Sequence, residues 1–520
     1  MTRKRMIMKK EDGDSRDAGI GAKFYNETIT MITSNLPCPC PRRPSSRMVP
    51  PEILARIFWF NPPVSIQLPA NYTQVCSFWR AVARTSPEIW TTLIMEAPSA
   101  LHTQMDVKSF EAALTDWISC SSDLSIDLTV HDWPSLRWPS KRRRTRYTKL
   151  YKRVVLGFSN KWRRLVIPNS WDAQDFLSEL QIQPSLNALE ELTLSVPRVL
   201  TDQRYLYPPF SSSKNLHRLH INITHEVVAY PFLETFISET VNVLTVKSVH
   251  GLFQDFKFLR AFLRIEQLQN ITHMSLSTVC WLSPSAYTTF PATTLTNLRE
   301  LVVFGNTHGL SRLLRVLTLP SLVRLGLSTA AYLSLEERNE SALEPALLSF
   351  MKRSGSSHLA CGLLCLTLTG ILREGAPQTL TLSSLSDILS TPAANTIQEL
   401  HIQCEENGSQ VATAATTASL MEMLRYDSDI PRRQLLPHLT TFSASHLYDS
   451  SIPSQSYFAD FAHSRWWPEN AKPRMPGVAR LETLVLQNCR LTETTQDQLR
   501  ICYEGGLSSK PRSLYSIDVS

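Results

Sequence analysis

The chain has 520 residues, of which 43% are hydrophobic and 19% are charged. This composition supplies enough apolar residues for a sizeable core and excludes a protein that is disordered throughout. Glycine is scarce at 16 residues and proline is frequent at 32. These counts argue against glycine-rich nucleotide-binding loops and favour a chain of many short segments. The formal net charge of +7 is modest for this length.

Residues 1–46 are charged and then rich in serine and proline, without sustained hydrophobic periodicity, so we expect a disordered N-terminal tail. The tail lacks the apolar core of a secretory signal, and no stretch of about 18 uncharged apolar residues follows that could cross a membrane. The ten cysteines are scattered, without zinc-finger spacing. We therefore expect reduced, buried thiols in an intracellular protein of the cytoplasm, the nucleus or both.

Residues 47–95 predict a small helical unit. In "PPEILARIFWF", which begins at Pro50, apolar residues recur at helical spacing. A second apolar helical stripe lies in "VCSFWRAVARTSPEIW", and Ser86 before Pro87 ends that helix. A unit of about 45 residues is close to the lower limit for independent folding. Its surplus apolar surface indicates that it packs against a partner.

Residues 96–160 predict a transition segment. "DLSIDLTV" at residues 123–130 resembles a degenerate first copy of the repeat described below. The basic run "KRRRTR" at residues 141–146 predicts a solvated loop. A nuclear localisation signal and a nucleic-acid contact are the alternatives for such a run. No aromatic platform or zinc-finger pattern accompanies it, so nucleic acid is not the expected partner.

The pattern apolar-x-x-apolar-x-apolar recurs eleven times within residues 161–505. Its central residues are Leu165, Leu192, Leu219, Leu244, Met274, Leu301, Leu325, Leu366, Leu400, Phe442 and Leu484. The first six spacings are 24 to 30 residues, close to the leucine-rich-repeat period, and the last four are 34 to 42. The longer spacings imply insertions or additional degenerate repeats. We predict an α/β solenoid of strand–helix repeats, curved as a horseshoe, with a C-terminal tail over residues 506–520. An ordinary α/β domain with several such strands is the alternative.

The two helical segments, in this order and ahead of a repeat array, resemble the F-box proteins with leucine-rich repeats. Val49 stands where the family has leucine. The resemblance implies an F-box that binds the Skp adaptor, and through it the cullin and RING subunits of an SCF-type ubiquitin ligase, while the repeats hold a protein substrate. The residues that match the adaptor-binding pattern are Pro50, Pro51, Ile53, Leu54, Ile57, Phe58, Val75, Cys76 and Trp79.

The chain departs from the family within residues 61–74, where three prolines stand near the place of a short leucine-rich helix. Pro69 would break or shift that helix, because proline lacks the backbone N–H that the helix needs. An alternative function follows from this departure: a protein-interaction scaffold with a degenerate F-box that does not bind the adaptor.

Substrate binding is expected on the concave face, because residues next to the apolar strand positions point to the opposite side of the sheet. The candidates are Arg218, His220, Lys247, His273, Phe304, Arg324, Glu399 and His401. Their mixed charges suit a protein ligand better than a polyanion. Trp466 and Trp467 are either binding anchors on a loop or part of the cap on the last repeat. No nucleotide-binding, hydrolase or metalloprotease motif occurs, so we expect neither an enzyme nor a cofactor or metal site.

Overall fold

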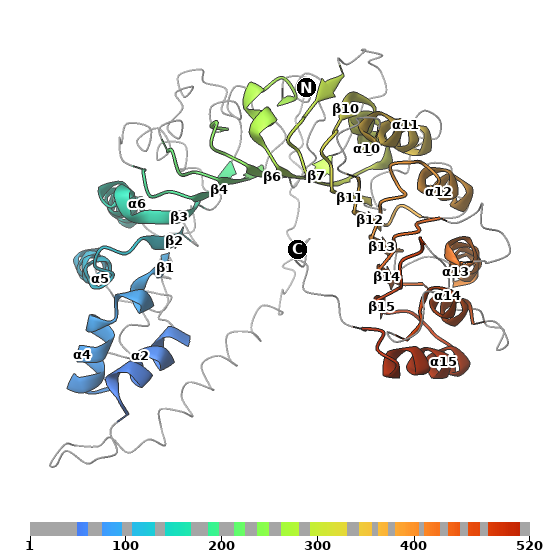
Figure 1. Cartoon of the computed structure of the whole chain (residues 1–520). Helices are drawn as coiled ribbons and strands as arrows, with labels where there is room; N and C mark the ends of the chain where they lie inside the picture. Colours follow the sequence, from blue (N-terminus) through green and yellow to red (C-terminus); the bar gives the residue numbers. More distant parts are fainter. Residues whose placement is uncertain are drawn as a thin grey trace, which may run out of the picture.

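The structure of the chain is a computed structural model. It describes residues 49–60, 75–95, 107–130, 141–167, 186–196, 213–223, 237–248, 262–279, 292–329, 343–355, 362–372, 380–404, 410–426, 435–447, 456–468 and 477–509. The predicted tail over residues 1–46 and the proline-rich segment at residues 61–74 lie outside these ranges. The chain forms an arch in which strands line the inner side and helices cover the outer side (Figure 1). No helix in the described ranges is long and apolar enough to cross a bilayer.

One 13-stranded sheet runs through the whole arch, and every neighbouring pair of its strands is parallel. Its strands are β1 (Thr92–Met95), β2 (Ile126–Val130), β3 (Trp162–Ile167), β4 (Glu191–Val196), β5 (Arg218–Ile223), β6 (Val243–Ser248), β7 (His273–Val279), β9 (Glu300–Gly305), β11 (Arg324–Thr329), β12 (Cys365–Thr369), β13 (Glu399–Gln403), β14 (Thr441–Ser445) and β15 (Thr483–Gln487). A short second sheet pairs β8 (Thr293–Thr294) with β10 (Leu317–Thr318).

The strand register confirms the predicted repeat. The eleven central apolar residues align in one continuous row from Leu165 on β3 to Leu484 on β15. Every residue of this row is buried. The row also extends backwards through Leu128 of β2, as the degenerate copy predicted, to Leu93 of β1. The chain is therefore a repeat solenoid of the leucine-rich type, whose neighbouring repeats bury one another's apolar faces.

The long spacings near the C-terminus are insertions and not missed repeats, because β11 to β15 pair directly in succession. The outer side of the arch carries α5 (Val107–Cys120), α6 (Lys141–Gly157), α10 (Thr307–Val316), α11 (Leu343–Gly355), α12 (Leu382–Leu389), α13 (Gln410–Leu424), α14 (Tyr457–Arg465) and α15 (Glu493–Glu504). Short 3-10 helices occur at η1 (Pro87–Trp90), η2 (Ser159–Lys161) and η4 (Glu266–Asn270). Asn306, Thr381 and Thr492 cap α10, α12 and α15, each accepting a backbone N–H of the first turn.

Asparagine side chains tie successive turns together just before the strands. Asn215 Nδ2 donates to the carbonyl oxygen of Asn187 at 2.6 Å, and Asn297 Nδ2 donates to that of Gln269 at 2.8 Å. Asn270 Nδ2 likewise donates to the backbone carbonyl oxygen of Glu239. These bonds satisfy turn carbonyls that the parallel sheet leaves unpaired. They therefore hold the repeats at a constant offset along the arch.

The helical unit at the N-terminal end contains α2 (Pro51–Phe60), α4 (Ser77–Thr85) and η1. Phe58 meets Trp79 edge-on, with ring centroids 5.3 Å apart. Leu54, Val82 and Ile89 complete the small core between these elements. The unit was expected to extend to residue 95. That boundary is wrong, because residues 92–95 form β1, the first strand of the sheet.

The basic run at residues 141–146 was expected to form a loop, but it forms the first turns of α6. The physical reason lies further along that helix. Tyr151 and Val155 are fully buried, and Tyr151 stacks on Phe110 of α5 at 5.9 Å. This packing anchors the C-terminal half of α6, and helix propagation then extends it through the basic residues.

At the C-terminal end, one expected boundary changes and one open alternative is decided. The fold continues past residue 505, since Leu507 is buried and the backbone of Ser508 bonds with both Glu482 and Leu484. Trp466 and Trp467 are each only 7% exposed. Trp466 packs so closely against Gly505 that a Cβ there would lie 2.4 Å from its ring. The tryptophan pair therefore belongs to the cap of the last repeat and not to an exposed anchor.

Candidate functional site

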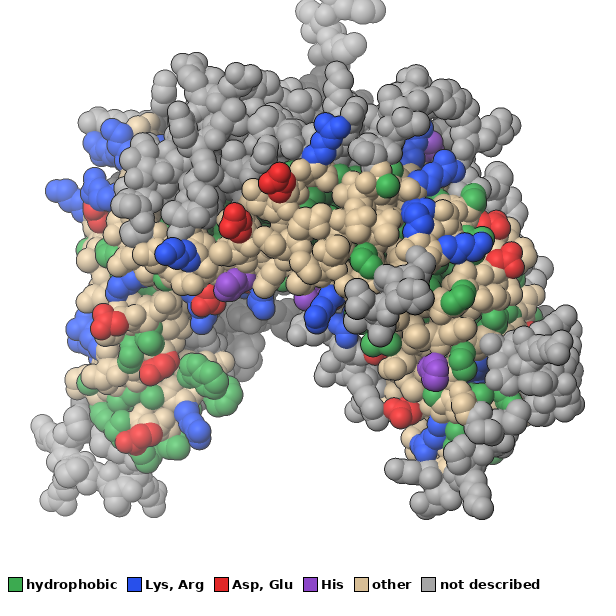
Figure 2. All heavy atoms as spheres, turned by 45° about the horizontal axis from the view of Figure 1, so that its top comes forward, with side chains coloured by type: hydrophobic (Ala, Val, Ile, Leu, Met, Phe, Trp, Pro, Cys, Tyr) green, Lys and Arg blue, Asp and Glu red, His purple; other side chains and the backbone are tan. Residues whose placement is uncertain are grey.

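The helical unit carries an exposed apolar surface, which we call the end patch. It consists of Val49, Ile53, Ile57, Trp59, Phe60 and Val75. Among the described residues, it holds six of the nine large hydrophobic side chains that are exposed, and the side chain of Phe60 is 78% exposed. Figure 2 shows hydrophobic side chains gathered over α2 and α4, interspersed with a few charged ones. Such a concentration on one small unit is typical of a protein-interaction surface.

Helix geometry explains the end patch. Leu54 and Phe58 stand four positions apart and are 1% and 0% exposed, so they form the inner stripe of α2. Ile53 and Ile57 form a second stripe one position earlier, which faces solvent. Because the chain's own α4 and η1 cover only the inner stripe, the second stripe and the aromatic residues after it are left without cover by the described residues.

The structure divides the nine predicted adaptor-binding residues into three groups. Pro50, Pro51, Ile53, Ile57 and Val75 are exposed. Leu54 and Phe58 were expected to face the adaptor, but in this chain both side chains pack inside the helical unit.

The remaining two predicted residues have structural roles of their own. Cys76 is the N-cap of α4, where its Sγ accepts the backbone N–H of Trp79 at 3.4 Å. Trp79 is partly buried against Phe58. Both therefore shape α4 and its contact with α2 before any partner binds.

The concave face of the sheet carries a second constellation, which we call the charged row. Strand pairing aligns the residues that directly precede the central buried residue of each repeat: Asp127, Arg164, Glu191, Arg218, Val243, His273, Glu300, Arg324, Cys365, Glu399 and Thr441. Acidic and basic residues alternate along much of this row, and the three glutamates occupy the same position of their repeats.

Each glutamate of the charged row is the centre of a cluster. Arg164 Nε lies 2.8 Å from Glu191 Oε1, and Arg218 Nη1 lies 3.8 Å from Oε2. His220, two residues after Arg218 on β5, places its Nε2 3.8 Å from Glu191 Oε1. Burial lowers the pKa of His220, although the negative charge of Glu191 acts in the opposite direction.

The second cluster joins His273 Nε2 and Arg324 Nη1 to Glu300 Oε2, each at 3.8 Å. In the third, His401 Nε2 lies 3.7 Å from Glu399 Oε2. The hydrogen bond from His401 is the main reason that the pKa of Glu399 is lowered. Partly exposed ion pairs of this kind each contribute at most about 1 kcal/mol to stability. These clusters therefore contribute little to the stability of the fold.

All eight predicted substrate-binding residues lie on strands of the concave face. Six of them fall into the three clusters. Lys247 of β6 pairs with Asn222 of β5, two residues beyond the pair formed by Thr245 and His220. Phe304 is opposite Ser328 of β11. The structure thus places the predicted residues on one surface but does not gather them into one pocket.

Arg164 and Cys365 are members of the charged row that the sequence analysis did not propose as binding residues. Arg164 sits between Asp127 and Glu191 in the strand register. Cys365 was interpreted as a buried thiol; it is half-buried and lies on the concave face next to Glu399. Both could have been found by aligning the repeats, because each directly precedes a central leucine.

No protein-family model matches the sequence, and no curated protein matches it. Among solved structures, the chain is similar to an internalin, InlF, of Listeria monocytogenes, at 14% identity with a TM-score of 0.28. The match covers 66% of this chain and 89% of the internalin chain. So distant a likeness says nothing about function, and the repeat architecture stands on the strand register itself.

Proposed function

We propose that this protein is the substrate-recognition subunit of an SCF-type cullin–RING ubiquitin ligase. In this proposal the helical unit is an F-box that binds the Skp adaptor, and the repeats bind a protein substrate. The observation that carries the proposal is the end patch, which combines exposed Ile53, Ile57, Trp59 and Phe60 on one short helix. Covering such side chains is worth about 1.5–3 kcal/mol each when they become fully buried.

The proposed mechanism is tethering. The adaptor, cullin and RING subunits would bring the charged conjugating enzyme close to a substrate held on the concave face. Tethering raises the local concentration of the reacting groups without chemistry by this chain. The rigid sheet between β1 and β15 would keep the substrate at a constant distance from the end patch. No catalytic residue of this chain is required.

The test is binding to purified Skp adaptor by isothermal titration calorimetry. The informative variant is Ile53→Asp with Ile57→Asp, because both side chains are exposed and their loss leaves the core of the helical unit intact. Phe58→Asp is unsuitable, since Phe58 is fully buried and its replacement would unfold the unit. Ile501→Asp is the matched control, because Ile501 is 61% exposed on α15 at the other end of the arch.

We expect the wild type and Ile501→Asp to bind equally and the double variant to bind at least about 100-fold more weakly. Circular dichroism should show the same fold and thermal transition for all three. A folded wild type that does not bind the adaptor would overturn the proposal. The protein would then be a repeat scaffold whose helical unit serves a different partner.

On the substrate side, we propose that the clusters around Glu191 and Glu300 contact a protein of mixed surface charge. Arg218→Glu with Arg324→Glu reverses two charges that flank these carboxylates. The variant should lose captured substrates in a comparative ubiquitination profile while retaining the adaptor. Unchanged substrate capture would exclude this part of the concave face.

A further inference from the structure

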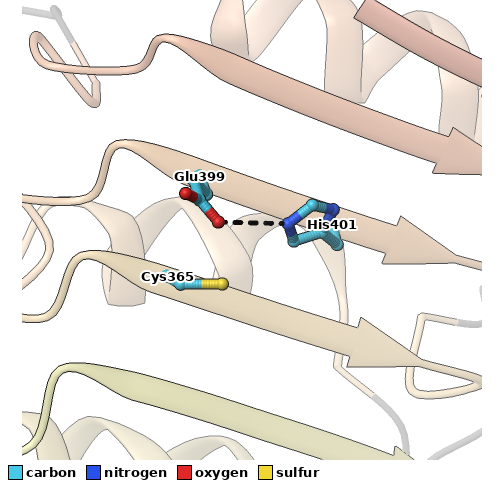
Figure 3. A group of neighbouring side chains, drawn as sticks. All are labelled: Cys365, Glu399 and His401. Carbon is cyan, nitrogen blue, oxygen red and sulfur yellow. Dashed lines mark ion pairs between the residues drawn. The ribbon is translucent and has the colours of Figure 1, made fainter. Parts of the chain in front are cut away.

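Three different metal-ligand side chains converge on the concave face between β12 and β13 (Figure 3). They are Cys365, Glu399 and His401, and one donor atom of each lies within 4.8 Å of the other two. Within the described residues, no other group of three histidine, cysteine or acidic side chains meets this condition. The first two side chains belong to the charged row, but the cysteine has no equivalent in the other two glutamate clusters.

The strand register explains why these donors meet. Cys365 of β12 is the direct cross-strand partner of Glu399 of β13. Glu399 and His401 are two residues apart on one strand, so their side chains point to the same face. Both strands are internal to the sheet, with β11 and β14 hydrogen-bonded on either side. The backbone is thus held firmly, and closing the donors around an ion requires only rotation of side chains.

The donor set fits zinc. Zn²⁺ binds sulfur, imidazole nitrogen and carboxylate oxygen at about 2.0–2.3 Å in tetrahedral geometry, which places neighbouring donors about 3.3–3.8 Å apart. His401 Nε2 and Glu399 Oε2 are already 3.7 Å apart. A thiolate and a carboxylate together would balance the charge of the ion. Calcium and magnesium are poor candidates because they require oxygen ligands.

We propose that Cys365, Glu399 and His401 form a Zn²⁺ site on the concave face. The fourth coordination position faces the open side of the arch, where it holds water or a side chain of a bound protein. The site does not depend on the proposed ligase function.

The surrounding charges are compatible with this site. Arg324 lies opposite Cys365 on β11, but its guanidinium is directed to Glu300, with Nη1 and Oε2 3.8 Å apart. Thr367, the cross-strand partner of His401, is uncharged. Burial raises the pKa of the Cys365 thiol to about 12. Zinc would therefore have to displace a proton from this thiol on binding.

The experiment measures binding of Zn²⁺ and of Co²⁺, its spectroscopic substitute, to the full chain after treatment with a chelator. Cys38 and Cys40 are replaced by serine in every sample, because two cysteines so close in sequence bind metals on their own. We expect one equivalent of Zn²⁺ to bind in competition with a chromogenic chelator. Co²⁺ should give a sulfur-to-metal charge-transfer band and the intense visible bands of a tetrahedral ion.

Cys365→Ser should abolish the charge-transfer band, and Glu399→Gln and His401→Gln should each weaken Zn²⁺ binding by more than about 100-fold. His273→Gln is the matched control, because His273 forms a similar pair with Glu300 but has no cysteine beside it. Cys489→Ser controls for another partly buried thiol. Both controls should bind like the parent. The proposal is overturned if the folded parent binds no zinc, or if the Cys365, Glu399 and His401 variants bind as tightly as the controls.

Discussion

Trp117 donates its indole Nε1–H to the backbone carbonyl of Trp90 at 2.9 Å, and the two rings meet edge-on with centroids 5.0 Å apart. Trp90 ends the helical unit, while Trp117 belongs to α5 on the first repeat. Trp90 Nε1 in turn donates to the carbonyl of Ala83 on α4 at 2.7 Å. These two buried hydrogen bonds therefore connect α4 of the helical unit to α5 of the first repeat, and they help to fix the orientation of the helical unit.

We predict that Trp117→Phe loosens this connection. The substitution leaves the carbonyl of Trp90 buried without that donor, which costs about 1–3 kcal/mol. Hydrogen exchange should accelerate first in α2 and α4, because their link to the repeats is weakened. Trp162→Phe is the control, since Trp162 makes an equivalent buried bond to Val155 within the first repeats. If both variants accelerate exchange in the same segments, Trp117 has no special role in orienting the helical unit.

Arg465 is buried, and its guanidinium donates three hydrogen bonds to backbone carbonyls. Nε donates to Leu424 at 2.8 Å, Nη1 to Leu436 at 2.9 Å and Nη2 to Leu435 at 2.5 Å. It joins the end of α13 to the turn before β14. We predict that Arg465→Met lowers the free energy of unfolding by at least about 3 kcal/mol, because two buried carbonyls and one partly buried carbonyl lose their donors.

The control for Arg465 is Arg500→Met on the outer surface, where Arg500 pairs with Asp497 at 3.3 Å. That change should cost less than about 0.5 kcal/mol. Urea unfolding of both variants measures the difference. Equal losses would show that the carbonyl contacts of Arg465 contribute no more than an exposed ion pair.

The sequence predicted the repeats well because the buried row has a simple physical cause. Each repeat must place one leucine-like residue against the next, so positions such as Leu192 and Leu219 are visible at a regular spacing. Strand β1 was missed because "TLIM" is only four residues long and precedes the first recognisable copy. Helix α6 was missed because its basic residues suggested solvent exposure, whereas the buried residues that stabilise it come later.

The candidate sites were predicted less completely for two reasons. In α2 the apolar residues form two adjacent stripes, and the sequence alone does not tell which stripe, that of Phe58 or that of Ile57, is covered by the chain itself. On the concave face, the residues were predicted but their partners were not. The pairing of Cys365 with Glu399 depends on the strand register across a lengthened repeat, in which the central leucines are 34 residues apart.

Cys76 provides a test that separates a folding role from an adaptor-binding role. As the N-cap of α4, it accepts the N–H of Trp79 through sulfur. Serine is a stronger cap, so Cys76→Ser should keep or slightly raise stability, and Cys76→Ala should lose about 0.5–1 kcal/mol. Thermal unfolding and adaptor titration are measured together. A loss of adaptor affinity in Cys76→Ser without loss of stability would instead indicate direct contact with the partner.

His220 predicts a dependence of stability on pH. Burial lowers its pKa below the usual value of 6.5, so between these two values the unfolded chain binds more protons than the folded protein. The stability that neutral His220 contributes is therefore complete above pH 6.5 and is lost as the pH falls through the lowered pKa. We expect the free energy of unfolding to fall over this range in the wild type, and more weakly in His220→Gln.

Two further variants make the cause of the His220 effect measurable. Glu191→Gln removes the negative charge that raises the pKa of His220, so NMR titration should show a still lower pKa in that variant. Thr245→Ala alters the cross-strand neighbour of His220 without changing a titratable group, and it should leave the pH slope unchanged. If the slope is the same in His220→Gln as in the wild type, another group controls it, and the burial of His220 has no measurable effect on folding.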